Sequence, residues 1–380
     1  MGCDHRNRRR HRLARLAVAA VVPAGLLVSA LAPAASGGTV SHKKTPLQQG
    51  QAYFHGKNIT FVSPDGAGSN FDILARLIAP VLSRYLGANV VVEDLTAGNG
   101  VTAFNTIAHS NPDGLTIGWL NPSVALEDLL QGIPGVSFNP SHVSMLGATP
   151  GPDSFLCAAP STGIKTFKQL QSNTGTSLKW LAPSSGSAFF SAKMLPLVFG
   201  LKTQTISAYS GSSAAQTGFL RGDGQVYYSS GASLGPVVTQ GKCNLLAVTT
   251  PEPKDNANYS ISTGAGVPDL LSLIKKFKPT NGLQKAAKTA MTLWIEGSVD
   301  DIYAAGKVPN DVYQALSWGL KKTLTDAGYE ANERATGSAV GYVSGPVAKQ
   351  IWVSSFSKLS TGLRIIGLCP QSGCPGAPKK

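Results

Sequence analysis

Residues 58–86 place an apolar run, a glycine-rich turn and an amphipathic segment in direct succession, and this order constrains the fold more than any other part of the chain. The run 59–62 is typical of a buried strand, and the turn after it reads Pro64-Asp-Gly-Ala-Gly-Ser69. Residues 73–86 then repeat apolar side chains at the helical period. Free backbone N–H groups at such a turn attract anions, carboxylates included. The sequence therefore predicts a strand, turn and helix that together can hold a small acid.

The N-terminal residues predict export. Six arginines precede an apolar stretch at 16–31, and Ala32-Pro-Ala34 offers a small-residue cleavage site. This order is that of a secretory signal peptide over residues 1–34. The alternative is an uncleaved membrane anchor, but the stretch is short for a spanning helix and contains Pro23 and Gly25. Arg9-Arg10 leaves twin-arginine export open beside the general secretory route, and we expect a periplasmic or secreted protein.

The net charge of +13 falls to about +8 without residues 1–34, because these hold six arginines and one aspartate. The remaining lysines are scattered, and no basic stripe with interleaved aromatic residues is present. The composition therefore argues against nucleic-acid binding. About 346 residues remain, which exceeds one ordinary hydrophobic core and predicts two lobes.

Strand-like and helix-like segments alternate along the chain. Strand-like runs stand at 59–62, 90–92, 115–120, 144–148, 155–158, 178–181, 205–208, 226–229, 245–249, 293–295 and 363–368. Helix-like segments stand at 71–86, 100–109, 122–131, 187–199, 212–220, 309–326 and 346–358. This alternation predicts an α/β fold in which helices flank mostly parallel sheets. Polar residues 35–56 predict a loose leader, and Pro/Gly-rich residues 369–380 predict a frayed tail.

Four cysteines remain after the predicted cleavage, and an even number in an exported chain favours disulfides. Cys369 and Cys374 are close enough in sequence to form a local bridge. Cys157 and Cys243 then either pair with each other or remain buried free thiols. No cysteine or histidine spacing is zinc-like, so we expect no metal and no cofactor.

Several segments resemble the substrate-binding receptors of tripartite tricarboxylate transporters, the Bug-type receptors. They are residues 61–76 (FVSPDGAGSNFDILAR), 90–100 (VVVEDLTAGNG) and 111–117 (NPDGLTI), followed by 209–212 and 241–250. The resemblance spans residues 57–360 and implies a two-lobe, type II periplasmic-binding-protein-like fold. It implies a first lobe of residues 57–156 plus 246–368 and a second lobe of 157–245. Strands near 155–159 and 245–249 would cross between the lobes.

The resemblance also implies a set of ligand contacts. In the first lobe these are Ser63, Gly66, Ala67, Gly68, Ser69 and Asp72, and in the second lobe Ser184, Ser185, Gly186, Ser187, Tyr209 and Ser212. The residues themselves agree in kind, because Ser184–Ser187 follow a strand and open a helix, which makes a second anion-binding turn. Asp72 has two readings: it holds an amino or hydroxyl group of the ligand, or it only stabilises the first turn of its helix.

The function that follows is capture without catalysis. We expect a monomeric receptor that closes on a small organic acid, a di- or tricarboxylate or a related carboxylate, and presents it to membrane permease subunits. One alternative is a sensor or scaffold protein that has the fold but no transport role. Another is a secreted hydrolase, since Gly231-Ala-Ser-Leu-Gly235 matches the nucleophile-elbow pattern. No histidine follows Ser233 in the chain, which argues against a hydrolase of that fold.

Overall fold

A computed structural model describes residues 43–98, 100–120, 125, 129, 132, 134–139, 142–151, 153–173, 175–184, 186–249, 266–296, 299–336, 338–365 and 369. The predicted signal peptide and nearly all of the predicted helix at 122–131 lie outside these residues. The elements below belong to the unit formed by residues 44–380.

The first sheet has six strands in the order β11-β4-β10-β3-β1-β2. Its strands are β1 (Asn58–Ser63), β2 (Asn89–Asp94), β3 (Thr116–Leu120), β4 (Ser144–Pro150), β10 (Val299–Ala304) and β11 (Val343–Ser344). β1 pairs in parallel with β2 and β3, and β10 is antiparallel to both β3 and β4. The first four strands therefore run in one direction, and β10 and β11 run against them.

The second sheet has five strands in the order β7-β6-β8-β5-β9. They are β5 (Ser154–Ala158), β6 (Leu178–Pro183), β7 (Thr203–Tyr209), β8 (Val226–Ser230) and β9 (Asn244–Thr249). Only β5 runs against the others, because it is antiparallel to both β8 and β9. In both sheets most strands share a direction, as the alternation of strands and helices predicts.

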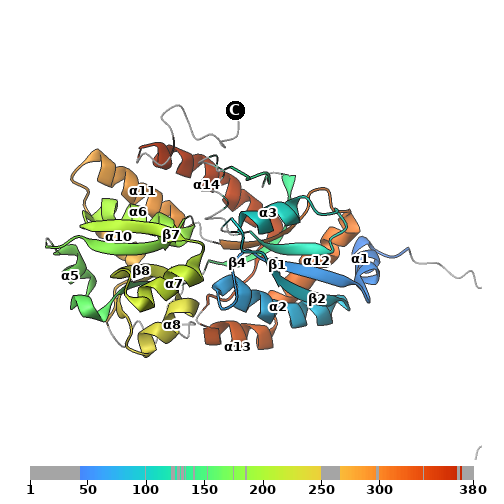
Figure 1. The fold of residues 1–380 in the computed structure, drawn as a ribbon. Helices are drawn as coiled ribbons and strands as arrows, with labels where there is room; N and C mark the ends of the chain where they lie inside the picture. The colour runs from blue at the N-terminus through green and yellow to red at the C-terminus, as the bar shows by residue number, and fades with distance from the viewer. Residues whose placement is uncertain are drawn as a thin grey trace, which may run out of the picture. The chain divides into compact units, whose positions relative to one another are not determined.

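Helices cover both faces of each sheet (Figure 1). The first lobe carries α1 (Pro46–Phe54), α2 (Asn70–Leu86), α3 (Val101–Ala108), α12 (Asn310–Leu324) and α13 (Ala327–Thr336). The second carries η2 (Pro160–Thr162), α5 (Phe167–Gln171), α6 (Ser187–Phe199), α7 (Ser212–Arg221), α8 (Gly231–Thr239), α10 (Leu270–Lys276) and α11 (Gly282–Glu296). α14 (Gly345–Ile365) packs against both α11 and β4.

Alternate residues of a strand enter different cores, which is why the runs are apolar throughout. In β1, Phe61 packs with the α2 and α12 side chains, whereas Val62 packs with Phe104 of α3 on the opposite face. In β6, Trp180 and Leu181 divide in the same way between two clusters. A strand that is buried on both faces has the near-continuous apolar pattern of a helix-covered sheet.

The predicted loose leader is wrong for residues 46–54, which form α1. Thr45 and Gln48 make a capping box at its start, with each side chain bonded to the other residue's backbone N–H. Gly50 faces α12 so closely that an added Cβ would lie 2.0 Å from the Asp311 carbonyl oxygen. The contact is non-local, so the polar composition of 35–56 gave no sign of it.

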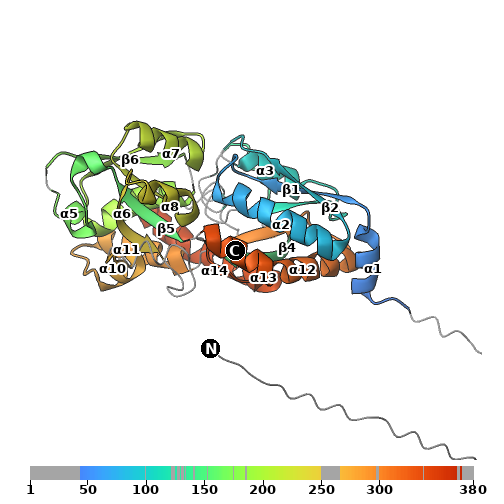
Figure 2. The same ribbon diagram turned by 90° about the horizontal axis from the view of Figure 1, so that it is seen from below.

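The crossings between lobes also differ from the expectation. β5 and β9 both belong to the second sheet, so the predicted boundaries at 156/157 and 245/246 fall inside strands of one lobe. The chain instead crosses between β4 and β5 and returns between α11 and β10. α10 and α11 pack with the second lobe, as their orange ribbons beside the green strands show (Figures 1 and 2).

Two predicted strands are wrong. Residues 293–295 lie in α11, and residues 363–365 lie at the end of α14. Both are short apolar runs, which look alike in a strand and in a buried helix turn. Within the described residues, no helix combines the length and apolarity that crossing a membrane requires.

Candidate functional site

A cavity of about 250 Å³ is lined by residues of both sheets and their helices. Ser69 and Asn70 come from the first lobe, and Ser187, Ser212 and Ser229 come from the second. This volume is slightly below the usual range for ligand pockets, about 300–1,000 Å³, and suits a compact molecule.

In the described part of the chain, four helices of eight residues or more begin at this cavity. α2, α6, α7 and α8 each follow directly on a strand, and each contributes a serine at or near its first residue: Ser69, Ser187, Ser212 and Ser230. The first backbone N–H groups of a helix lack helical partners and carry partial positive charge. Such ends around one cavity favour anionic groups of a bound molecule.

The start of α2 supplies a free hydrogen-bond donor. Ser69 is the N-cap and accepts the backbone N–H of Asp72 at 3.2 Å. Asn70 is only 7 % exposed, and its Oδ1 accepts the hydroxyl of Ser338 at 3.3 Å. Its Nδ2 has no partner among the described residues. A buried amide donor without a partner costs about 1–3 kcal/mol, so a ligand oxygen here would relieve that cost.

The other predicted first-lobe contacts build the turn and do not line the cavity. Ser63 donates its hydroxyl to the carbonyl oxygen of Asp65 at 2.9 Å. Gly66, Ala67 and Gly68 form the turn, with Gly68 at φ +79° and its N–H donated to Asp72 Oδ2 at 2.9 Å. The other oxygen of Asp72 accepts from Arg76. Both Asp72 oxygens are therefore engaged at the start of α2. This agrees with the interpretation in which Asp72 only stabilises the first turn of its helix.

The second lobe brings together some of its predicted contacts. Ser187 and Ser212 line the cavity, whereas Ser184 and Gly186 position the start of α6. Ser184 donates its backbone N–H to the Tyr209 carbonyl oxygen at 3.2 Å. The Tyr209 hydroxyl donates to Asp223 at 2.8 Å, so its polar end is engaged away from the cavity. Ser185 lies outside the described residues.

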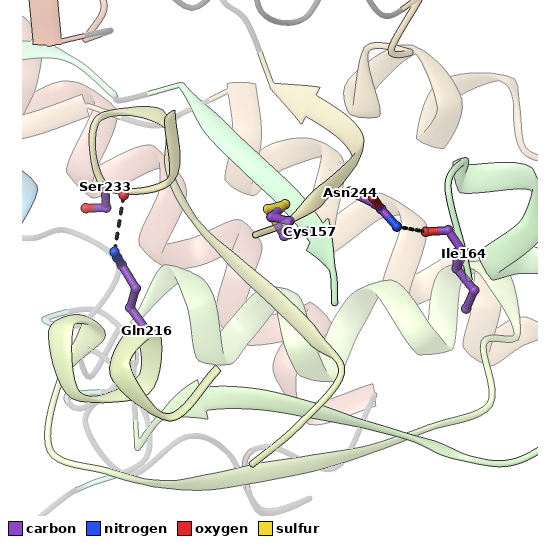
Figure 3. The surroundings of a disulfide bond; sticks show 6 residues. Cys157, Ile164, Gln216, Ser233 and Asn244 are labelled. Carbon is purple, nitrogen blue, oxygen red and sulfur yellow. Dashed lines mark hydrogen bonds between the residues drawn. A yellow bond between two sulfur atoms is a disulfide. The ribbon is translucent and has the colours of Figure 1, made fainter. Parts of the chain in front are cut away.

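The start of α8 is a functional element that the sequence analysis missed. Ser229, Ser230 and Ser233 all line the cavity. The Ser230 hydroxyl donates to Ser233 Oγ at 2.9 Å, and Gln216 of α7 donates to the Ser233 carbonyl oxygen at 3.3 Å (Figure 3). The sequence does contain a pattern that predicts this helix start, because residues 226–233 repeat the order of strand, small polar turn and helix seen at 58–70. The segment Gly231–Gly235 was interpreted only as a nucleophile-elbow pattern.

Carboxylates form the remaining polar lining. Asp65 lies on the turn after β1, and Asp300 lies on β10. Burial, with a smaller contribution from Asp94, raises the pKa of Asp65 to about 6. Burial, with repulsion from Asp65, raises the pKa of Asp300 to about 8. β10 was not among the strands predicted from the sequence, and Asp300 was therefore not predicted as a site residue either.

Aromatic side chains support the cavity wall. Trp294 of α11 lines the cavity and stacks on Phe190 of α6, with ring centroids 4.1 Å apart and planes 18° from parallel. In the first lobe, the Trp119 indole donates to the Phe71 carbonyl oxygen at 3.0 Å. These contacts connect the helix starts to the buried cores, so the cavity lining is held by large, well-packed groups.

The disulfide between Cys157 and Cys243 lies in the second lobe (Figure 3). It joins β5 to the residue just before β9, its antiparallel neighbour, with Cα atoms 5.6 Å apart. This resolves the open alternative in favour of pairing. Cys369 is buried and disulfide-bonded, and Cys374, its predicted partner, lies outside the described residues.

Two α/β lobes with helix starts around a shared cavity define a solute-binding protein of the periplasmic type. The chain matches the tripartite tricarboxylate transporter family receptor over residues 74–267, half of its length. It therefore belongs to that family, as the resemblance at residues 61–76 and 90–100 predicts.

Known relatives agree with this assignment. A UPF0065 protein of Bordetella bronchiseptica is 26 % identical over 244 residues, which is 60 % of this chain and 65 % of the relative. The periplasmic binding protein BugD superimposes with a TM-score of 0.67 at 17 % identity, covering 82 % of this chain and 98 % of BugD. The R. palustris protein Rpa4515, solved with adipate, gives a TM-score of 0.66 at 18 % identity over 82 % and 97 % of the two chains. The likeness to these structures shows the fold.

Proposed function

We propose that this chain is an extracytoplasmic receptor that captures a small dicarboxylate in the cavity between its lobes and presents it to membrane permease subunits. The observation that carries the proposal is the meeting of four helix starts, from both lobes, at one cavity. A related structure holds adipate, a dicarboxylate, which supports this choice of ligand class.

The two lobes offer different groups to the two ends of such a ligand. In the first lobe, the unpartnered Nδ2 of Asn70 and the start of α2 are available to one carboxylate. In the second lobe, the hydroxyls of Ser187, Ser212 and Ser233 stand at three helix starts, available to the other. Each carboxylate oxygen accepts charge-assisted hydrogen bonds, which are stronger than neutral ones.

Capture and release follow from the connections between the lobes. The chain passes between the lobes twice, from β4 to β5 and from α11 to β10, and α14 packs on both lobes. A ligand bonded to both lobes favours their closed arrangement by its differential affinity for that arrangement. The predicted signal peptide and the family support an exported receptor that works beside a permease, and we propose that it acts as a monomer.

A hydrolase is disfavoured by the surroundings of Ser233. Its nearest hydroxyl partner is Ser230, and none of the histidines in the described part of the chain, His55, His109 and His142, lines the cavity. A serine nucleophile requires an adjacent general base. Ser233 is better explained as a hydroxyl that binds a ligand oxygen at the start of α8.

Calorimetric titration of the purified protein with succinate, glutarate, adipate and malate tests the proposal. We expect saturable 1:1 binding of at least one of these acids, and no binding of the diamide or diester of the same acid. Binding of the uncharged analogues with equal affinity would contradict a carboxylate receptor.

A further inference from the structure

Asp300 is a buried carboxylate that reaches the cavity without a complete set of partners. It lies on β10 opposite Thr149 of β4, and it is 5 % exposed. Its side chain lines the cavity, and its Oδ2 accepts no hydrogen bond from any described residue. Buried polar atoms in folded proteins are nearly always bonded, so an unbonded one at a cavity indicates a missing partner.

The charges around the cavity show what kind of partner is missing. The described lining contains four carboxyl side chains, Asp65, Asp269, Glu296 and Asp300, and no lysine, arginine or histidine. Two of the four already have partners: Asp269 caps α10 by accepting the Ser272 N–H, and Glu296 pairs with Lys275. Asp65 and Asp300 have no ion-pair partner among the described residues. A positively charged group that donates hydrogen bonds suits the part of the cavity beside these two carboxyl groups.

The helix starts, by contrast, favour negatively charged groups of the ligand in the same cavity. Asn70 Nδ2 and the first turns of α2, α6, α7 and α8 offer only donors. A simple dicarboxylate satisfies these donors but leaves Asp300 without a partner and adds negative charge beside it. Among the described residues, no three His, Cys, Asp or Glu side chains gather closely enough to hold a metal ion.

We infer that the ligand of this receptor carries an ammonium group in addition to its carboxylates, and that Asp300 accepts a hydrogen bond from that group. The inference rests on the proposed function and narrows its substrate class to amino-substituted dicarboxylic acids. The donors at the helix starts hold the carboxylates, and Asp300 selects for the amine. An ammonium beside Asp300 also favours its ionised form, which burial alone disfavours.

Matched pairs of acids that differ only by an amino group test the inference. The probes are succinate against aspartate, glutarate against glutamate, and adipate against 2-aminoadipate, each titrated by calorimetry at pH 7.5. For the pair that fits best, we expect the amino acid to bind at least about tenfold more tightly, as one charge-assisted hydrogen bond provides. The near-isosteric substitution Asp300→Asn should remove this preference and leave binding of the plain dicarboxylate equal or stronger.

Glu296→Gln is the matched control, because it removes the same charge from the lining at a carboxylate that is already paired with Lys275. It should leave the amino preference within about threefold of the unchanged protein. Plain dicarboxylates that bind as well as their amino counterparts would overturn the inference and leave the proposed function standing. A preference that survives Asp300→Asn would also overturn it. Binding of no acid in either series would instead contradict the proposed function, and the inference with it.

Discussion

Asn70 is the residue whose chemistry most directly ties the fold to carboxylate binding. Asn70 lines the cavity, its Oδ1 is engaged by Ser338, and its buried Nδ2 has no partner among the described residues. The substitution Asn70→Asp keeps the acceptor for Ser338 but replaces the free donor by a carboxylate oxygen. We expect dicarboxylate affinity to fall by at least about tenfold, because a charge-assisted bond becomes a repulsion. Titration calorimetry measures the change.

Ser338→Ala is the control for that substitution, since it removes the positioning bond and keeps the Asn70 donor. Its effect should be smaller than that of Asn70→Asp. Equal losses in the two variants would indicate that Asn70 acts only through the packing of the α2 start and makes no bond to the ligand.

Ser233 decides between a receptor and an enzyme. Its hydroxyl accepts from Ser230, and no histidine of the described cavity lining stands beside it as the general base that a serine nucleophile requires. We expect no turnover of p-nitrophenyl acetate or butyrate by the unchanged protein, and a loss of affinity of about tenfold or less in Ser233→Ala. Ester hydrolysis that Ser233→Ala abolishes would establish the hydrolase instead.

At the scale of elements, the strand, turn and helix at 58–86 was predictable because everything that makes it is local. The strand, the Ser69 cap, the Asp72 contact and the apolar stripe of α2 all lie within 29 residues of sequence. The same holds for α6 and α7. α1 was not predictable because the close approach of Gly50 to α12 depends on residues far away in the sequence.

Asp300 shows more clearly what could not be predicted from the sequence. Residues 299–304 read Val-Asp-Asp-Ile-Tyr-Ala, and two adjacent carboxylates argue against a buried strand. Yet all six residues are buried, because β10 is paired on both sides by β3 and β4. Charged residues in a buried strand contradict the local sequence preference for such strands. Where such a strand lies at a cavity, a functional residue is expected.

The disulfide connects the residue just before the outermost strand β9 to the neighbouring strand β5 in the second lobe. It closes a loop of 86 residues, which on the chain-entropy account stabilises the fold by about 4.6 kcal/mol. The double variant Cys157→Ala/Cys243→Ala should therefore unfold at a lower urea concentration and lose most of its sensitivity to dithiothreitol. An unchanged midpoint would show that the β5–β9 pairing needs no covalent link.

At the scale of the whole molecule, buried carboxylates make stability depend on pH. Burial raises the pKa values of Asp153, Asp300 and Glu333 to about 8, well above those of unfolded acids near 4. Between these values the folded state binds more protons than the unfolded state, so the free energy of unfolding falls as pH rises. The unliganded protein should have its highest Tm near pH 5 and a lower one at pH 8.

Differential scanning calorimetry between pH 5 and pH 8 checks whether the Tm falls as the pH rises. Asp153→Asn should flatten the slope, because both oxygens of Asp153 lack described partners and its carboxyl is fully buried. A Tm that climbs steadily from pH 5 to pH 8 would contradict the account of these acids as protonated groups in the folded protein.

Hydrogen–deuterium exchange of the protein with and without its bound acid tests the central claim, that both lobes hold one ligand through helix starts. The account predicts slower exchange in the first turns of α2, α6, α7 and α8, with no change in α1, which lies away from the cavity. Protection confined to one lobe, or found only outside these four turns, would contradict it.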